Sequence, residues 1–366
     1  MAGRQNPPDV EWSAAILHLD MDAFYVNVYI QDHPEDNGIP LVVGGRPDQR
    51  GVVSSASYEA RQLGIHSAMP TSRARRICPD LKIVPADWGR IRERSRQVMA
   101  VLQPYGAVEQ ISVDEAYVDL GGHADPLTAA AAVKREVQNA TGLPCSVGLA
   151  TSKLVAKVAS DHDKPDGFTV VLPGKEAAFL APLPTRAIWG IGPRTSERLA
   201  ALHIVTCAQL AAAALEQLRP VLGNQAALFV ERAQGIDTRE VSSQRGQAKS
   251  ISQEWTFNRD VSDQELLEQQ LHTMSTAVAQ SLRKKGLVAH TVTIKIRWAD
   301  FTTFTRQKSY EVPFDGEREV KDMALALFRE HWSEGQLIRL LGVGVSNLGT
   351  PEARQLRLPL DSGKSR

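Results

Sequence analysis

The 366-residue chain has few cysteines, no long apolar run and no excess of charge of either sign. Its 3 cysteines lie far apart and form no CxxC or Cys/His ligand spacing, which argues against a structural zinc site and a disulfide framework. No window approaches the roughly 18 apolar residues of a membrane span, and residues 1–12 contain no apolar segment after a basic one. We therefore expect a cytoplasmic protein with no membrane partner.

The charges cancel over the whole chain. Lys plus Arg and Asp plus Glu each number 42, which at first sight argues against a protein that binds nucleic acid. Basic residues are nevertheless concentrated in two segments, residues 73–96 and 283–308. The neutral sum therefore does not describe these surfaces, and we expect nucleic-acid binding that is modest and sensitive to salt.

The length favours two to four domains, at about 100–200 residues per domain. Strand and helix patterns alternate up to residue 174, with a hairpin at 39–55, a helix at 126–141, a strand at 145–150 and a helix at 152–161. This alternation predicts a ferredoxin-like sheet. Strand signals disappear after residue 175, which predicts an all-helical module, and strand patterns return at 250–257, 291–298 and 307–312. The expected parts are an extension (1–14), an α/β region (15–174), a helical module (175–241), a linker (242–249), a second α/β domain (250–350) and a tail (351–366).

Two groups of carboxylates lie at the ends of predicted strands. Asp20 and Asp22 end an apolar strand, and Asp114 and Glu115 lie at the turn between two others. Adjacent carboxylates repel one another, so they are tolerated mainly where cations neutralise them. A single acid at a strand end is more often an exposed loop residue, but both groups are flanked by apolar residues and so lie at the edge of a core. Oxygen ligands of this kind suit magnesium, and two such ions can promote an in-line phosphoryl displacement.

Four motifs occur along the chain in a fixed order. They are Asp20-Met21-Asp22-Ala23-Phe24-Tyr25, Ser57-Tyr58-Glu59-Ala60-Arg61, Ser112-Val113-Asp114-Glu115-Ala116 and Lys164-Pro165-Asp166-Gly167. Together they resemble the signatures of the Y-family translesion DNA polymerases, and within that family the DNA polymerase IV branch. The resemblance extends from Ile16 to about Leu348. It implies an α+β multidomain fold: a ferredoxin-like palm with fingers at about residues 32–86, a helix-hairpin-helix thumb and a C-terminal α/β little finger.

The resemblance also implies the active-site residues. Asp20, Asp114 and Glu115 would be catalytic and bind two Mg²⁺ ions, with Mn²⁺ as an alternative, and the Met21 carbonyl would be a further ligand. Tyr25 would be a steric gate that excludes the ribose 2′-hydroxyl. Without the motif, Tyr25 would be interpreted as an ordinary aromatic residue of the core. The remaining nucleotide contacts would be Ser55, Tyr58, Arg61 and Lys164. Tyr58 and Arg61 are three residues apart on a predicted helix and so lie on one face.

The implied reaction is template-directed DNA synthesis. The partners would be primer–template DNA and a dNTP: the primer 3′-oxygen attacks the α-phosphorus and pyrophosphate leaves. The resemblance implies low fidelity and lesion bypass by a monomer, and we expect no proofreading exonuclease.

Further segments are candidates for DNA contacts. Gly190 and Gly192 lie in a glycine-rich turn that resembles a helix-hairpin-helix, in which backbone N–H groups bind phosphate, although such a turn also occurs as an ordinary helix cap. Lys295, Arg297, Arg306 and Lys308 belong to the basic segment of the C-terminal domain. Strand alternation predicts that Thr291, Thr293, Lys295 and Arg297 share one face, directed either at phosphates or at solvent.

The tail contains a short peptide of alternating leucines after a glutamine. Gln355, Leu356, Leu358 and Leu360 resemble the peptide that binds the bacterial sliding clamp. The pattern is short and also arises by chance, so its position in a polar tail is the main support for this interpretation.

Two positions depart from the family pattern. Tyr29 stands where the family usually has glutamate, and Ser152-Lys153 stands where it usually has Asn-Lys. Neither replaces a metal ligand, so the departures bear on the subfamily. Two other hypotheses remain: a non-catalytic paralogue that binds DNA or the clamp, and another two-metal palm enzyme such as a nucleotide cyclase. The first predicts lost carboxylates, and the second leaves the helix-hairpin-helix and the basic C-terminal domain without a role.

Overall fold

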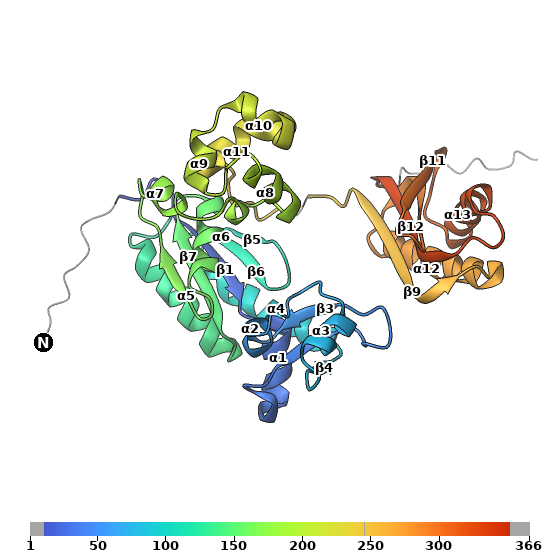
Figure 1. Ribbon diagram of the computed structural model, residues 1–366, viewed down its shortest axis with the longest axis horizontal. Helices are drawn as coiled ribbons and strands as arrows, with labels where there is room; N and C mark the ends of the chain where they lie inside the picture. The colour runs from blue at the N-terminus through green and yellow to red at the C-terminus, as the bar shows by residue number, and fades with distance from the viewer. Residues whose placement is uncertain (1–10, 245, 352–366) are drawn as a thin grey trace, which may run out of the picture. The chain divides into compact units, whose positions relative to one another are not determined.

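The computed structural model describes residues 11–244 and 246–351, and the chain divides into two compact units, Met1–Arg245 and Gly246–Arg366. Figure 1 shows the elements of each unit. Each unit has its own apolar core. Within the described ranges, no helix has the length and apolarity needed to cross a membrane.

The first unit is built on a five-stranded sheet whose strand order is β5-β6-β1-β7-β8. The pairs β1–β6, β1–β7 and β5–β6 are antiparallel, and β7–β8 is parallel. The predicted hairpin around residue 114 and the predicted strand at 145–150 are both present. The strands are β1 (Ile16–Met21), β5 (Val108–Gln110), β6 (Glu115–Asp119), β7 (Cys145–Ala150) and β8 (Phe168–Val170).

Helices cover both faces of this sheet. Leu17 and Leu19 of β1 belong to a core cluster with α4 (Trp88–Leu102) and α5 (Pro126–Thr141). The alternate residues face α6 (Lys153–His162): His18 is hydrogen-bonded through Nδ1 to the Ser160 hydroxyl at 2.7 Å. The same alternation therefore places Asp20 on the α6 side of the sheet.

A smaller sheet of order β3-β2-β4 precedes α4 in the chain. The expected hairpin is present, because β2 and β3 pair antiparallel. A separate apolar cluster that includes Val42, Ile65 and Leu81 stabilises this part. Its elements are α1 (Phe24–Asp32), β2 (Leu41–Gly44), β3 (Val53–Ala56), α2 (Tyr58–Gln62), α3 (Thr71–Ile77) and β4 (Lys82–Val84).

The helical module of the first unit follows β8. Its described residues form helices and 3-10 turns and no β-strand, as predicted. Its helices are α7 (Glu176–Leu180), α8 (Pro193–Ala200), α9 (Cys207–Ala212), α10 (Leu215–Leu222) and α11 (Ala226–Ala233). Short 3-10 turns occupy Pro34–Asp36, Gln103–Tyr105, Thr185–Ala187 and Gly223–Gln225.

The second unit is an antiparallel sheet of order β11-β10-β12-β9 with two helices. Both helices pack against the sheet through one continuous apolar core. The strand β12 was not predicted, because Gly342 and Gly344 interrupt its β-pattern. The elements are β9 (Ser250–Val261), α12 (Gln264–Lys284), β10 (Val288–Trp298), β11 (Thr303–Phe314), α13 (Glu317–His331) and β12 (Ile338–Gly349).

Gly148 allows α6 to lie close against β7. A Cβ atom at this position would lie 2.0 Å from the Ala156 carbonyl oxygen and 2.5 Å from the Ser160 nitrogen, both of α6. We expect Gly148→Ala to destabilise the protein by about 1–3 kcal/mol, because the helix backbone must move away from the sheet. Urea denaturation measures this loss. Gly122→Ala is the matched control, because a Cβ there meets no atom within 4 Å; equal stability of the two variants would contradict the prediction.

Candidate active site

The ends of β1 and β6 bring the predicted catalytic carboxylates to one edge of the sheet. Asp20 is the cross-strand partner of Glu115 in the β1–β6 pair. The Met21 N–H donates to the Asp114 carbonyl at 3.0 Å and fixes the turn before β6 against the end of β1. The Ser112 hydroxyl accepts from the Asp114 and Glu115 N–H groups at 3.2 and 3.0 Å, which closes the turn.

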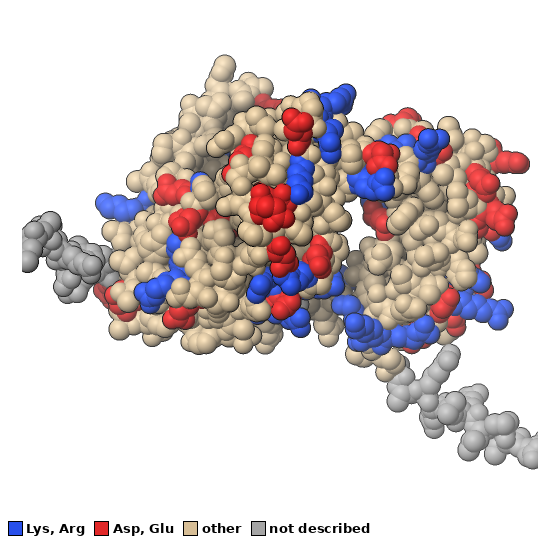
Figure 2. Space-filling view, turned by 90° about the horizontal axis from the view of Figure 1, so that it is seen from below, with Lys and Arg blue, Asp and Glu red and all other residues tan. Residues whose placement is uncertain are grey.

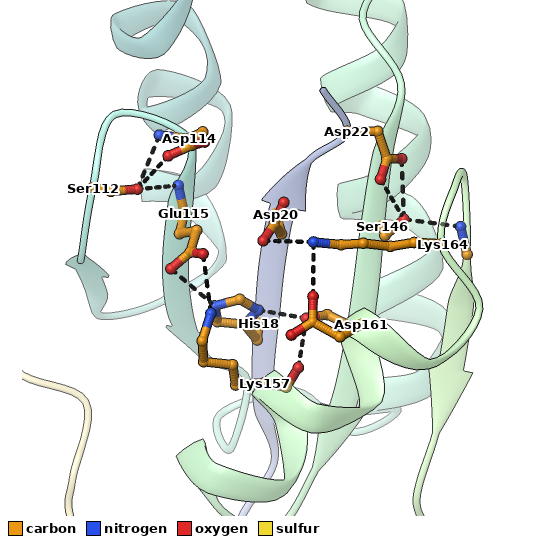
Figure 3. A network of polar contacts seen from close by, with 12 residues as sticks. His18, Asp20, Asp22, Ser112, Asp114, Glu115, Ser146, Lys157, Asp161 and Lys164 are labelled. Carbon is orange, nitrogen blue, oxygen red and sulfur yellow. Dashed lines mark hydrogen bonds and ion pairs between the residues drawn. The ribbon is translucent and has the colours of Figure 1, made fainter. Parts of the chain in front are cut away.

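Each carboxylate has a partner of its own (Figure 3). Lys164 Nζ lies 2.7 Å from the Asp20 carboxylate, and Lys157 Nζ lies 3.0 Å from Glu115. Asp114 accepts a hydrogen bond from the Ser112 hydroxyl. The ligand atoms of the three acids do not all lie within 4.8 Å of one another. The sequence predicted the acids but missed Lys157, which reaches Glu115 only because α6 packs on the sheet.

Burial raises the pKa of Asp20 to about 7, against the opposing effect of the Lys164 ammonium. Burial lowers the pKa of Lys164, but its ion pairs with Asp20 and Asp161 outweigh burial and raise the pKa above its ordinary value. Burial disfavours the ionised form of Asp20, and a cation beside the carboxylate would stabilise that form. The acids are hard oxygen donors, the type that Mg²⁺ prefers, so the residues present fit a divalent cation.

A cavity of about 210 Å³ opens at this sheet edge. Eight of the nine residues predicted to bind metal or nucleotide line it, and Glu115 is the one that does not. The eight are Asp20, Met21, Tyr25, Ser55, Tyr58, Arg61, Asp114 and Lys164.

The helices α1 and α2 carry Tyr25, Tyr58 and Arg61, whereas Lys164 lies between α6 and β8. The half-buried Tyr25 ring makes an edge-on contact with Trp88, with ring centroids 5.5 Å apart. The Arg61 guanidinium lies 4.8 Å from the Tyr58 ring centroid, in agreement with the predicted shared helix face. Trp88 was missed, because nothing in its local sequence pattern indicates that it meets Tyr25.

Asp22 has a different environment from Asp20. Ala23 has a φ of 41°, so the chain leaves the extended conformation directly after Asp22. Asp22 is 1% exposed and accepts hydrogen bonds from Tyr58, Ser146 and the Asp166 N–H. Burial and the Asp22 carboxylate raise the pKa of Tyr58 above its ordinary value. The two acids of the first motif therefore do not form one pair.

The two departures from the family pattern lie outside the cavity lining. The Tyr29 hydroxyl donates to Asp36 at 3.0 Å, and the Tyr29 ring stacks on His33. The Ser152 hydroxyl caps the start of α6. Lys153 forms an ion pair with Glu109 at 2.6 Å.

Gly190 and Gly192 lie in the turn before α8, and Gly192 is the N-cap residue of that helix. Gly190 has a φ of 102°, a conformation that favours glycine. The Trp189 carbonyl of the same turn accepts from the Arg232 guanidinium at 3.1 Å.

The basic residues of the second unit occupy two faces of its sheet. In the β10–β11 register, Arg306 pairs with Ile294 and Lys308 with Val292, whose side chains belong to the core. Residues directly opposite each other share a face, so Arg306 and Lys308 lie on the face opposite to Lys295 and Arg297. The basic segment that is predicted to contact DNA is therefore divided between the two faces of this sheet. Thr291 shares a face with Lys295 and Arg297, as predicted, but it is 1% exposed and hydrogen-bonded to Ser309.

Charge of both signs is distributed over the surface, and Figure 2 shows Lys and Arg beside Asp and Glu on both units. Lys295, for example, forms an ion pair with Glu254 at 2.8 Å. The tail peptide Gln355, Leu356, Leu358 and Leu360 lies outside the described residues.

Comparisons with known proteins identify the family to which this chain belongs. A model of the impB/mucB/samB family matches residues 19–161, one of that family's C-terminal domain matches 248–358, and one of its HHH motif matches 173–204. DNA polymerase IV of Dehalococcoides mccartyi is 40% identical over 96% of this chain and 90% of its own length. DNA polymerase IV of Halorhodospira halophila is 40% identical over 93% of this chain and 97% of its own. A solved chimera of the Y-family polymerases Dbh and Dpo4 superposes with a TM-score of 0.81 at 24% identity, covering 92% of this chain and all of the chimera.

Together with these relatives, the acidic sheet edge, the helix-hairpin-helix motif and the C-terminal sheet domain identify the chain as a nucleic-acid polymerase. The chain belongs to the impB/mucB/samB family, the Y-family DNA polymerases. It is a DNA-directed DNA polymerase of the class that carries out translesion synthesis, and its substrates are DNA and dNTPs. Enzymes of this family are metal-dependent nucleotidyltransferases. Membership rules out the cyclase hypothesis.

Proposed function

We propose that the cavity at the ends of β1 and β6 is the polymerase active site, with Asp20, Asp114 and Glu115 as catalytic acids. The observation that carries this proposal is the shared cavity, because eight of the nine residues predicted to bind metal or nucleotide line it although they lie far apart in the sequence. Retention of all three acids also favours an active enzyme over a non-catalytic paralogue.

Asp20, Asp114, Glu115 and the Met21 carbonyl would hold two Mg²⁺ ions, or Mn²⁺ in their place. When bound, the ions activate the primer 3′-oxygen and stabilise the charge on the leaving pyrophosphate. The three acids supply the negative charge that attracts the ions. In this structure, Lys164 neutralises Asp20 and Lys157 neutralises Glu115.

The other cavity residues would bind and orient the dNTP. Arg61 provides a planar guanidinium, Lys164 an ammonium, and Tyr58 and Ser55 hydroxyl groups, which suit the β- and γ-phosphates. Tyr25 forms the wall against the sugar and excludes a 2′-hydroxyl by contact. Single-nucleotide insertion on a defined primer–template tests these roles; normal insertion after loss of the acids would overturn the proposal.

DNA would be held by the turn at Gly190 and Gly192 and by basic residues of the second unit. These basic residues lie on opposite faces of that sheet, so Lys295 and Arg297 would contact DNA as one group and Arg306 and Lys308 as another. A monomeric enzyme in the cytoplasm remains our prediction.

The tail peptide would bind the sliding clamp. Removal of residues 351–366 is expected to abolish stimulation of synthesis by the clamp, because a tether raises the effective concentration of the polymerase at the primer by about 10²-fold or more. Primer extension with and without clamp measures this effect. Synthesis without clamp should not change, and Lys364→Ala serves as a substitution in the same tail outside the peptide. Equal stimulation of the full and shortened chains would contradict the prediction.

A further inference from the structure

Asp22 is a buried carboxylate that connects three segments of the first unit. Figure 3 shows its contact with Ser146. It accepts from the Tyr58 hydroxyl of α2 at 3.1 Å and from the Ser146 hydroxyl of β7 at 2.9 and 3.0 Å to its two oxygens. The third donor is the Asp166 N–H, at 2.8 Å, in the segment between α6 and β8. A carboxylate that is 1% exposed is costly unless donors of this kind surround it.

Two of these donors, Tyr58 and Asp166, belong to the segments that carry three of the proposed triphosphate contacts, namely Tyr58, Arg61 and Lys164. Tyr58 is itself one, and it lies under the Arg61 guanidinium. Asp166 follows Lys164 by two residues. Ser146 strengthens the connection, because its hydroxyl also accepts from the Gly167 N–H at 3.1 Å. Asp22 therefore fixes the position of α2 relative to the Lys164 segment.

We propose that Asp22 is a positioning residue for the incoming nucleotide: it holds the Tyr58 hydroxyl and the Lys164 segment in place for the triphosphate and does not bind the catalytic metal. This inference rests on the assignment of Tyr58 and Lys164 to the triphosphate under the proposed function. No donor to Asp22 is a cation, and its oxygens are engaged by Tyr58, Ser146 and Asp166.

The Tyr58 hydroxyl has a single proton, which it donates to Asp22 in this structure. A phosphate oxygen would compete for that proton when the nucleotide binds. Asp22 would still accept from Ser146 and Asp166. The hydroxyl can donate to only one of the two acceptors at a time, so Asp22 positions it before the phosphate takes over the proton.

The substitution Asp22→Asn tests the proposal. Tyr58 and the Asp166 N–H donate to different oxygens of Asp22. Asparagine replaces one of these oxygens by an NH₂ group, so either Tyr58 or the Asp166 N–H loses its acceptor. We expect the KM for dCTP opposite template dG to rise about tenfold, the size of the loss of a hydrogen bond to a charged group, while kcat at saturating dCTP stays within about twofold.

The control is Asp36→Asn. Asp36 is also buried, at 5% exposed, and accepts from a tyrosine hydroxyl, that of Tyr29, at 3.0 Å, but it does not line the cavity. Both variants should lose thermal stability, whereas only Asp22→Asn should raise the KM. An equal KM in the two variants, or a fall in kcat at unchanged KM for Asp22→Asn, would overturn the proposal.

Tyr58→Phe separates this inference from the proposed function. If Tyr58 does not bind the nucleotide, Tyr58→Phe leaves the KM unchanged, and the assignment of Tyr58 and the positioning role fail together. If Tyr58→Phe raises the KM and Asp22→Asn does not, only the positioning role fails. The double variant should show less than the product of the two single effects, because the residues act through one contact. Should Asp22→Asn fail to fold, Ser146→Ala removes one donor and should raise the KM in the same direction; no change in that variant would then overturn the proposal.

Discussion

Asp114→Ala is expected to reduce primer extension by roughly 10³-fold, because a two-metal site contributes several kcal/mol to transition-state stabilisation and this substitution removes one of its acids. The fold should be kept, because the contact between the turn and β1 uses the Asp114 carbonyl and not its side chain. Single-nucleotide insertion under saturating dNTP measures the rate, and thermal denaturation measures the stability.

Asp119→Ala is the matched control for this prediction. Asp119 lies at the other end of β6, where its carboxylate accepts from the Gly121 N–H at 2.9 Å. This variant should extend primers at a rate close to that of the parent chain. Unchanged extension by Asp114→Ala would show that the metal assignment is wrong.

Tyr25→Ala is expected to admit ribonucleotides. The Tyr25 ring lines the cavity and is supported by Trp88, and its removal opens space where a 2′-hydroxyl would project. The ratio of kcat/KM for dCTP over rCTP should fall by about 10²-fold, the size of discrimination that steric exclusion of one hydroxyl provides. Single-nucleotide insertion with each substrate gives this ratio.

Tyr25→Phe separates the ring from its hydroxyl. Exclusion by contact needs only the ring, so this variant should keep the discrimination of the parent chain. Loss of discrimination in Tyr25→Phe would assign the role to the hydroxyl, and unaltered discrimination in Tyr25→Ala would remove the gate role.

Local signals in the sequence were sufficient for much of the fold. The helix α5 was predicted with its observed bounds, because Pro126 begins it and Gly142 follows its last residue. The strand β7 was also predicted with its observed bounds. The strand β12 was missed because its pairing with β10 and β9 compensates for glycines that locally disfavour a strand.

Features that depend on register or on packing between distant segments could not be predicted. Arg306 and Lys308 look like part of one patch with Lys295 until the β10–β11 register places them on the other face. The pairing of Lys157 with Glu115 requires α6 to lie against the sheet, and the separation of Asp22 from Asp20 requires the backbone to turn at Ala23. No local pattern encodes these relations.

The lysines beside Asp20 and Glu115 have a consequence for folding. In many metal sites the unneutralised ligands repel one another, so the polypeptide needs the ion in order to fold. Here the ammonium groups of Lys164 and Lys157 supply counter-charge to two of the acids from within the chain. We therefore expect the first unit to fold without divalent ions, so that the metal binds to a domain that is already folded.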